Sequence, residues 1–273
     1  SNEIKRKILT LYFHNDPLSM DGSQTIDQRK NLLKNCYKII FNSSWSKKRF
    51  LEGLENKFVN SDKLLVFHQS AKKGSLNLIS KKKKWITFVG KLNKAKGYDI
   101  FASAIKKVLN QNPEWRAKII GDEKREKITL KHSRADILGF KKHDEVLSIF
   151  KKTSIAVACS RWEEPFGRTS LEASANGCAV IITNKGGLPE TVTDAKILKK
   201  LNTKSLTQTL NYLIKNTDAR KKLQKLSIKN FYLTHNFVAN AIDNYRSEKI
   251  SYLKKINTVK PIRNLRILHI TNF

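Results

Sequence analysis

The stretch EEPFGRTSLEASANGCAVIITNKGGLPE, residues 163–190, decides the fold of this chain. Good helix formers and regularly spaced apolar residues follow its Phe-Gly turn, so a helix is predicted to begin near Phe166 or Gly167. Glu164 then lies just before this helix, and Glu172 lies about two turns inside it. The free N–H groups of a helix's first turn form a natural phosphate site. A carboxylate on each side of a phosphate suits a sugar nucleotide, with one carboxylate for the sugar hydroxyls and one for the ribose.

Short apolar strands alternate with amphipathic helices from residue 85 onward. The strands are expected at residues 85–89, 117–120, 137–138, 154–158 and 178–183. Because these strands are apolar on both faces, they need helices on both sides, which predicts a doubly wound, Rossmann-like parallel α/β sheet. Ligands in such sheets bind beyond the carboxyl ends of the strands. Gly90, Gly121, Gly139 and the loop after Ser160 all fall at those ends.

This region resembles the C-terminal domain of the family-4, or group 1, retaining glycosyltransferases of the GT-B fold. The resemblance rests on the opening stretch together with FVGKLNKAKGYDIFASAI at 88–105, KIIGDE at 118–123 and ILGF at 137–140, which follow the family order. A weaker likeness extends to about residue 245. The resemblance implies a complete domain that binds the nucleotide-sugar donor.

Four segments are expected along the chain. Residues 1–75 resemble only the last third of the family's acceptor domain, a truncated N-terminal Rossmann-like portion, and residues 76–84 form a basic linker. Residues 85–246 form the donor domain. Residues 247–273 combine a basic linker with the strand LRILHITNF, which resembles the start of a second GT-B domain.

Two explanations of the last strand stay open. The chain is an internal piece of a tandem protein with a second transferase following, or the strand completes the partial N-terminal sheet, as in a circular permutation. The first explanation is favoured, because one strand cannot supply the several βα units that the N-terminal portion lacks.

The resemblance assigns the donor diphosphate to a loop and a helix start. Gly90 ends the first strand of the donor domain, and Lys91 and Lys96 follow it as a clamp. The family more often has Arg at the position of Lys91, so the charge is kept but the bidentate geometry is lost. With the backbone of Phe166 and Gly167, these lysines would stabilise the charge on the departing phosphate, as fixed donors do in an oxyanion hole.

The remaining assignments also follow from the resemblance. Glu164 is expected at the hydroxyls of the transferred sugar, and Glu172 at the ribose. The base is expected near Gly139 and Phe140, where it contacts backbone groups more than side chains. His14, which ends an N-terminal strand, is expected to face the cleft near the transferred sugar.

Four neighbouring residues have less defined roles. Arg168 is expected to contact either phosphate or solvent. Glu163 is expected on the surface, and Gly186 and Gly187 are expected to shape the loop beside the sugar.

No metal site is expected, and no cofactor besides the donor substrate, a UDP-, GDP- or ADP-sugar. Metal-dependent transferases of the other major fold hold a cation with an Asp-x-Asp pair, and this chain has none. Cys36, Cys159 and Cys178 have neither metal nor disulfide spacing, which is typical of reduced thiols in a cytoplasmic protein.

The net charge of +31 has three interpretations. Binding to nucleic acid would need a recognisable basic module, and none is seen, so no nucleic-acid partner is expected. Attraction to an anionic membrane would suit a lipid-linked acceptor. A lysine-rich composition with solvated faces is the favoured interpretation. No apolar run reaches the length of a membrane span, and charges interrupt every apolar stretch near the N-terminus, so a cytoplasmic location is predicted, with peripheral contact at the inner face of the membrane left open.

The predicted function is metal-independent transfer of a sugar from a nucleoside-diphosphate sugar to a glycan or lipid-linked acceptor. The resemblance implies retention of configuration and a place in bacterial surface polysaccharide or lipopolysaccharide synthesis. Two alternatives stay open: a degenerate fragment that binds nucleotide-sugar without activity, and a basic nucleic-acid-binding protein.

Overall fold

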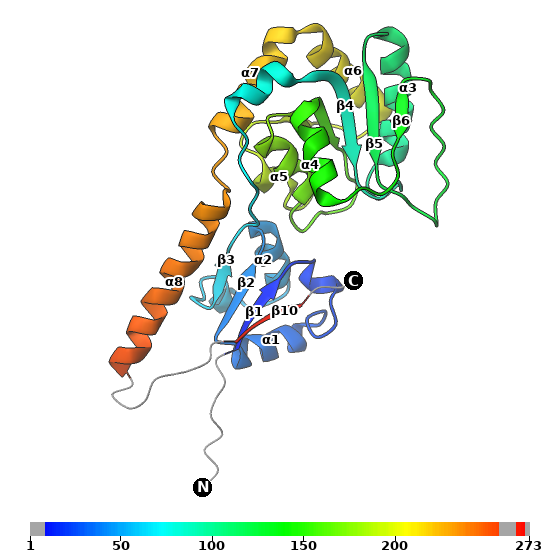
Figure 1. Cartoon of the computed structure of the whole chain (residues 1–273). Helices are drawn as coiled ribbons and strands as arrows, with labels where there is room; N and C mark the ends of the chain where they lie inside the picture. Colours follow the sequence, from blue (N-terminus) through cyan, green and yellow to red (C-terminus); the bar gives the residue numbers. More distant parts are fainter. Residues whose placement is uncertain (1–8, 257–265, 271–273) are drawn as a thin grey trace. The chain divides into compact units, whose positions relative to one another are not determined.

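The computed structural model describes residues 9–256 and 266–270. The chain forms two compact units (Figure 1). One unit takes the residues up to Gln69 together with those from His235, and the other is Ser70–Thr234. Each unit contains one parallel sheet, which confirms the predicted parallel α/β fold.

The sheet of the second unit has the order β6-β5-β4-β7-β8-β9. Its strands are β4 (Lys83–Val89), β5 (Arg116–Ile120), β6 (Ala135–Ile137), β7 (Thr153–Ala158), β8 (Ala179–Thr183) and β9 (Lys196–Leu198). Its helices are α3 (Tyr98–Gln111), α4 (His143–Lys152), α5 (Arg168–Ala175), α6 (Thr203–Lys215) and α7 (Thr217–Lys229), with 3-10 turns at Leu76–Lys81 and Leu188–Thr191. The chain runs outward from β4 to β6 and then returns to β7 beside β4. The strand order therefore reverses between β4 and β7, and a ligand site is expected at their carboxyl ends.

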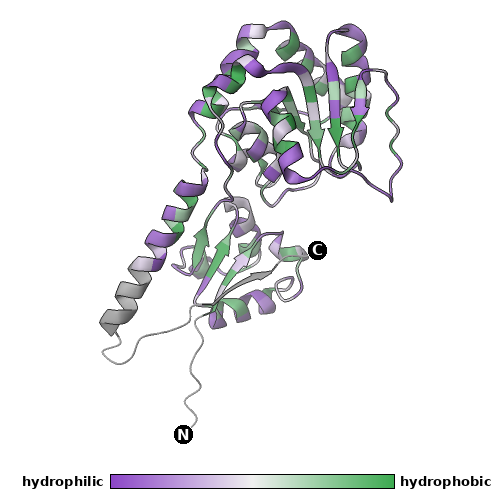
Figure 2. Cartoon of the chain, viewed as in Figure 1, coloured by the Kyte–Doolittle hydropathy of each residue, from purple (hydrophilic) through white to green (hydrophobic). Residues whose placement is uncertain are grey.

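The strands of this sheet are buried on both faces. Along β8, Ile181 belongs to the hydrophobic core that contains α3 and α6, while Val180 and Ile182 belong to the core that contains α4 and α5. In Figure 2 the strands are mostly hydrophobic, whereas the helices around them carry a hydrophilic face. This two-sided packing is the reason that the strands read as continuous apolar runs in the sequence.

The other unit has the sheet order β10-β1-β2-β3. Its elements are β1 (Leu9–Phe13), a 3-10 turn at Pro17–Ser19, α1 (Ile26–Asn35), β2 (Lys38–Phe41), α2 (Ser44–Leu51), a 3-10 turn at Asn56–Phe58, β3 (Leu64–Val66), α8 (His235–Ile256) and β10 (Arg266–Ile270). Three buried rings, those of Phe13, Phe41 and Phe50, meet in its core with centroids 5.2–5.6 Å apart. A small hydrophobic core thus forms from the few βα units present.

The end of the described chain lies in this first unit. Strand β10 pairs in parallel with β1, from Leu9 opposite Arg266 to Phe13 opposite Ile270. This pairing is the arrangement that the second explanation of the tail strand requires. Residues 257–265 and 271–273, which belong to the expected linker and tail, lie outside the described residues.

The unit boundary differs from the expected one at residue 246. Helix α8 continues to Ile256, through the first part of the expected linker. It groups with the first unit, and the ring of its Tyr245 lies 5.9 Å from that of Phe67, just after β3. The apolar pattern of residues 235–246 indicates a helix but carries no information about which unit it packs on.

Candidate functional site

Two loops meet where the strand order reverses, one after β4 and one after β7. The carbonyl of Ala95 in the first loop accepts hydrogen bonds from the backbone N–H groups of Arg161 (2.9 Å) and Trp162 (3.0 Å) and from Ser160 Oγ (3.1 Å). The backbone at Gly97 has φ 73°, and a Cβ there would lie 1.9 Å from the Cys159 carbonyl oxygen. Hydrogen bonds and close backbone contact therefore join the two loops into one surface.

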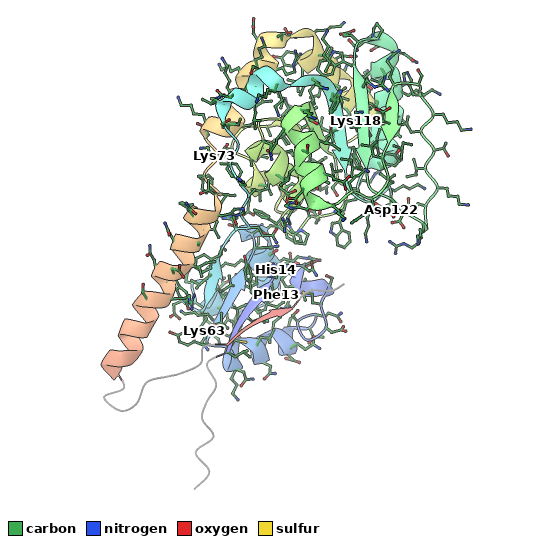
Figure 3. All side chains as sticks on the ribbon, in the orientation of Figure 1. Phe13, His14, Lys63, Lys73, Lys118 and Asp122 are labelled. Carbon is green, nitrogen blue, oxygen red and sulfur yellow. The ribbon has the colours of Figure 1, made fainter. Side chains whose placement is uncertain are left out.

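Further polar contacts fix the first loop from its other side. The Asn93 side chain accepts from the Lys96 backbone N–H at 3.0 Å and donates to Glu123 at 3.0 Å. The carbonyl of Asp122, which Figure 3 labels in the loop after β5, accepts from the Leu92 N–H at 3.3 Å. Hydrogen bonds from Arg125 and Asn93 lower the pKa of Glu123 to about 2, so this carboxylate is charged at neutral pH. The loop is thus held in place before any ligand arrives.

Lys96 and Glu164 lie together at the centre of this surface. The Lys96 amine contacts both carboxylate oxygens of Glu164, at 2.5 and 2.8 Å. The Glu164 side chain is 12% exposed and the Lys96 side chain 33% exposed. The structure therefore brings together the residue expected at the phosphates and the residue expected at the sugar hydroxyls. Lys91 lies on the same loop with an exposed side chain.

The helix start also lies at this end of the sheet. Helix α5 begins at Arg168, close to the predicted position, and its N-cap Gly167 has φ 109° with no side-chain cap. No capping side chain therefore competes for the N–H groups of the first turn. Phe166 is buried in the protein, with the whole residue 2% exposed, so its ring packs in the protein and does not face a ligand.

Glu172 lies in the middle of α5, and its side chain is only 8% exposed. Its Oε1 accepts from Arg168 Nε at 3.2 Å and Nη2 at 2.9 Å, and it lies 3.0 Å from His143 Nε2. Arg168, expected to contact phosphate or solvent, is therefore directed to Glu172. His143 begins α4.

The turn expected at the base connects β6 to α4. Gly139 has φ 65°, and its carbonyl accepts from the Gly121 N–H at 2.8 Å. Phe140 is 77% exposed. The turn presents both backbone groups and an open ring.

His14 belongs to the other unit, where Figure 3 labels it after β1. Its ring centroid lies 4.2 Å from that of Tyr12, and its Nδ1 lies 3.5 Å from Gln69 Nε2. Asn42 Nδ2 donates to its carbonyl at 2.8 Å. Its role near the transferred sugar stays a prediction.

Two contributions to the site were missed in the sequence. Glu163 is half exposed, yet its carboxylate accepts from Lys185 Nζ at 2.9 Å and from the Gly186 N–H at 2.5 Å. The Glu164 carbonyl accepts from the Gly187 N–H at 2.6 Å. These hydrogen bonds hold the turn at Gly186 and Gly187 beside Glu163 and Glu164. The contact joins positions that lie far apart in the sequence, so no local sequence pattern predicts it. The second missed residue is His143, because a single His at a helix start has no distinctive spacing.

Within the described part of the chain, no three His, Cys, Asp or Glu side chains cluster as metal ligands would. None of its helices there is long and apolar enough to cross a membrane. Burial raises the pKa of the Cys159 thiol to about 12 and raises that of Cys178 as well. These thiols are therefore protonated at neutral pH and are not nucleophiles of the site.

The fold is that of GT-B glycosyltransferases. The structure of HepE from Anabaena in complex with UDP has a TM-score of 0.74 at 18% identity, and the match covers 89% of this chain and 73% of that one. Sucrose-phosphate synthase from Thermosynechococcus elongatus has a TM-score of 0.66 at 14% identity, over 89% of this chain and 68% of that one.

The chain belongs to the group 1 glycosyl transferases, because residues 71–230, more than half of its length, match that family. It is 27% identical to spore coat protein SA of Bacillus subtilis over 162 residues, 53% of this chain and 43% of that protein. It is 37% identical to an uncharacterized glycosyltransferase of Methanocaldococcus jannaschii over 145 residues, 50% of this chain and 40% of that protein.

A third relative is the lipopolysaccharide core biosynthesis mannosyltransferase LpsB of Rhizobium meliloti. It is 30% identical over 121 residues, 41% of this chain and 34% of that protein. The chain thus spans less than half the length of these curated relatives.

Proposed function

We propose that this chain carries the donor site of a metal-independent, retaining glycosyltransferase that uses a nucleoside-diphosphate sugar. The Lys96–Glu164 pair at the end of β4 and β7 carries the proposal, because it places a phosphate-binding cation against a carboxylate suited to sugar hydroxyls. Membership of the group 1 family supports a transferase. The HepE structures, which hold UDP or UDP-glucose, support a nucleotide-sugar as the donor class.

In this proposal each part of the donor has a place. The diphosphate lies against Lys91, Lys96 and the first turn of α5, the ribose at Glu172, and the base at the turn with Phe140. Glu164 binds hydroxyls of the sugar. The paired lysine amine would exchange Glu164 for phosphate oxygens when the donor binds, which leaves the carboxylate for the sugar.

The transfer step follows from the same arrangement. The bond between the anomeric carbon and the diphosphate oxygen breaks, and the acceptor oxygen bonds to that carbon on the same face. The acceptor proton passes to the departing phosphate. Fixed cations and N–H groups stabilise the charge on that phosphate, as in an oxyanion hole, and no protein nucleophile is assigned.

The acceptor is proposed to be a glycan or a lipid-linked saccharide of a bacterial surface polymer. Relatives include proteins of a Klebsiella pneumoniae cps region and a lipopolysaccharide core transferase. The net charge of +31 supports peripheral contact with an anionic membrane, where a lipid-linked acceptor would lie.

A second candidate is a nucleotide-sugar-binding fragment without activity. The observation that favours it is length: the chain spans 43% of spore coat protein SA and 40% of the archaeal relative. Binding of the donor would then be kept while transfer is absent.

Calorimetry with UDP, GDP and ADP in EDTA tests the donor site. We expect at least one of them to bind, and its sugar conjugate to bind more tightly. Binding that disappears in EDTA and returns with magnesium or manganese would contradict the metal-free clamp. Turnover of the cognate sugar conjugate, with the anomeric configuration of the product read by NMR, separates a transferase from the inactive fragment and tests retention.

A further inference from the structure

We propose that His143 is a positioning residue that sets the ribose-binding carboxylate of Glu172 and makes the site selective for ribose over deoxyribose. This inference rests on the proposed nucleoside-diphosphate site and adds a residue and a specificity to it.

The hydrogen bonds to the Glu172 carboxylate all end on one oxygen. Oε1 receives the Arg168 guanidinium at 2.9 and 3.2 Å and His143 Nε2 at 3.0 Å. Oε2 accepts no hydrogen bond from any residue in the described part of the chain. The side chain is 8% exposed, and Oε2 is not among the buried polar atoms that lack a partner, so the little surface that the carboxylate exposes includes this oxygen. The geometry therefore leaves one oxygen fixed and the other free to accept from a ligand hydroxyl.

His143 approaches Glu172 from a different element than Arg168 does. Arg168 lies one turn before Glu172 on α5, so it moves with that helix. His143 is the first residue of α4, and it ties the carboxylate to the end of a second helix. A carboxylate held from two directions keeps one orientation, whereas one held by Arg168 alone can turn with that long side chain.

The backbone around His143 is itself held. The Glu145 carboxylate accepts from the Lys142 N–H at 3.0 Å, and the Gly139 carbonyl accepts from the Gly121 N–H at 2.8 Å. His143 comes three residues after Phe140 in the turn proposed for the base. One short, anchored segment thus reaches both the base position and the ribose carboxylate.

A role in stability alone does not account for this imidazole. Its side chain is 56% exposed, so it adds little to the core. Helices α4 and α5 already share a hydrophobic core that includes Val146, Phe150 and Ala173. Loss of the imidazole should therefore leave the fold intact and release the carboxylate.

The 2′-hydroxyl of ribose is a donor that deoxyribose lacks. Oε2 of a carboxylate that is held in one orientation accepts from it in a charge-assisted hydrogen bond. When the carboxylate is no longer held in one orientation, that bond weakens, while contacts to the phosphates and base are unchanged. The predicted signature is loss of ribose preference rather than general loss of binding.

The test uses whichever of UDP, GDP and ADP the wild-type protein binds, together with its 2′-deoxy counterpart. We expect the wild type to prefer the ribonucleotide by roughly tenfold or more, the size of a charged hydrogen bond. His143→Ala should weaken the ribonucleotide by about tenfold and change the deoxynucleotide by less than about twofold. His143→Gln, whose amide N–H reaches nearly the same place, should restore most of the preference.

His132→Ala is the matched control, because His132 is also in this unit but contacts Asn110 instead; it should behave as wild type. Equal losses for both nucleotides in His143→Ala, or an unchanged preference, would overturn the inference. Failure of His143→Gln to recover any preference would also count against it. If the wild-type protein binds none of the three diphosphates, the proposed function fails instead.

Discussion

At the scale of single residues, the Lys96–Glu164 pair sets how the site responds to a ligand. The two side chains neutralise each other in the absence of donor, at 2.5 Å. A diphosphate must therefore compete with Glu164 for the lysine amine. The sequence predicted that both residues belong to the site, because they stand in recognisable stretches. It did not predict that they bind each other, because that contact joins two separate loops.

Glu164→Gln should tighten binding of the nucleoside diphosphate by about two- to fivefold, the value of a partly exposed ion pair of roughly 0.5–1 kcal/mol. Without the charged Glu164 carboxylate, the Lys96 amine can bind phosphate without first breaking an ion pair. The sugar conjugate should lose about 1–3 kcal/mol of its advantage over the diphosphate, because a hydroxyl acceptor is weakened. Calorimetry of both ligands measures the two effects. Glu114→Gln, an exposed glutamate before β5, is the control, and a weaker diphosphate complex in Glu164→Gln would contradict the competition.

Lys96→Ala should weaken diphosphate binding by about 1.5–3 kcal/mol, because a charged hydrogen bond to phosphate is lost. The bare nucleoside should bind nearly as before. Lys94→Ala removes an exposed lysine of the same loop and should cost much less. Competition titrations with diphosphate and nucleoside provide the measurement; equal losses for both ligands would show that Lys96 does not face the phosphates.

At the scale of elements, the alternation of strands and helices was largely predictable. The buried strands are continuous apolar runs, and the amphipathic helices between them follow a clear period. Strand β9 was missed, because Lys196–Leu198 is only three residues long and mostly exposed. The contacts that join loop to loop, such as Glu163 with Gly186, were also missed, because sequence patterns report local periods and not distant neighbours.

Gly97→Ala should destabilise the protein by about 2–4 kcal/mol, because it combines a positive φ with a severe clash against the Cys159 carbonyl. The matched control is Gly139→Ala, which also has a positive φ but open space around the added Cβ. It should cost only about 1 kcal/mol of backbone strain. Urea unfolding measures both variants. Similar losses would mean that the loop around Gly97 relaxes and is not fixed by β7.

At the scale of the whole molecule, the proposed donor site lies within one unit. Every residue assigned here to phosphate, ribose, base or donor hydroxyls lies in Ser70–Thr234, and His14 lies in the other unit. The sequence left two explanations of the last strand open and favoured a second transferase domain over completion of the N-terminal sheet. The sequence pattern of a single strand such as β10 does not indicate which strand it pairs with. The structure shows that it pairs with β1.

Because the ends of Ser70–Thr234 are tied to each other, this unit should fold and bind donor by itself. The Ala71 N–H donates to the Leu233 carbonyl at 3.0 Å, and Lys73, labelled in Figure 3, donates to the Phe231 carbonyl at 2.9 Å. A protein cut at these boundaries loses no contact of the sheet or of its two cores.

We expect the separate unit to unfold in a single cooperative transition. Its affinity for the nucleoside diphosphate should lie within about twofold of that of the whole chain, because no residue of the first unit is assigned to the diphosphate, ribose or base, and a twofold change is only about 0.4 kcal/mol. Transfer to an acceptor should be absent, since His14 and the rest of the first unit are removed. Calorimetry on the unit and on the whole chain, with circular dichroism to follow unfolding, gives the comparison. A folded unit that binds more than tenfold more weakly would show that the first unit contributes to the donor site.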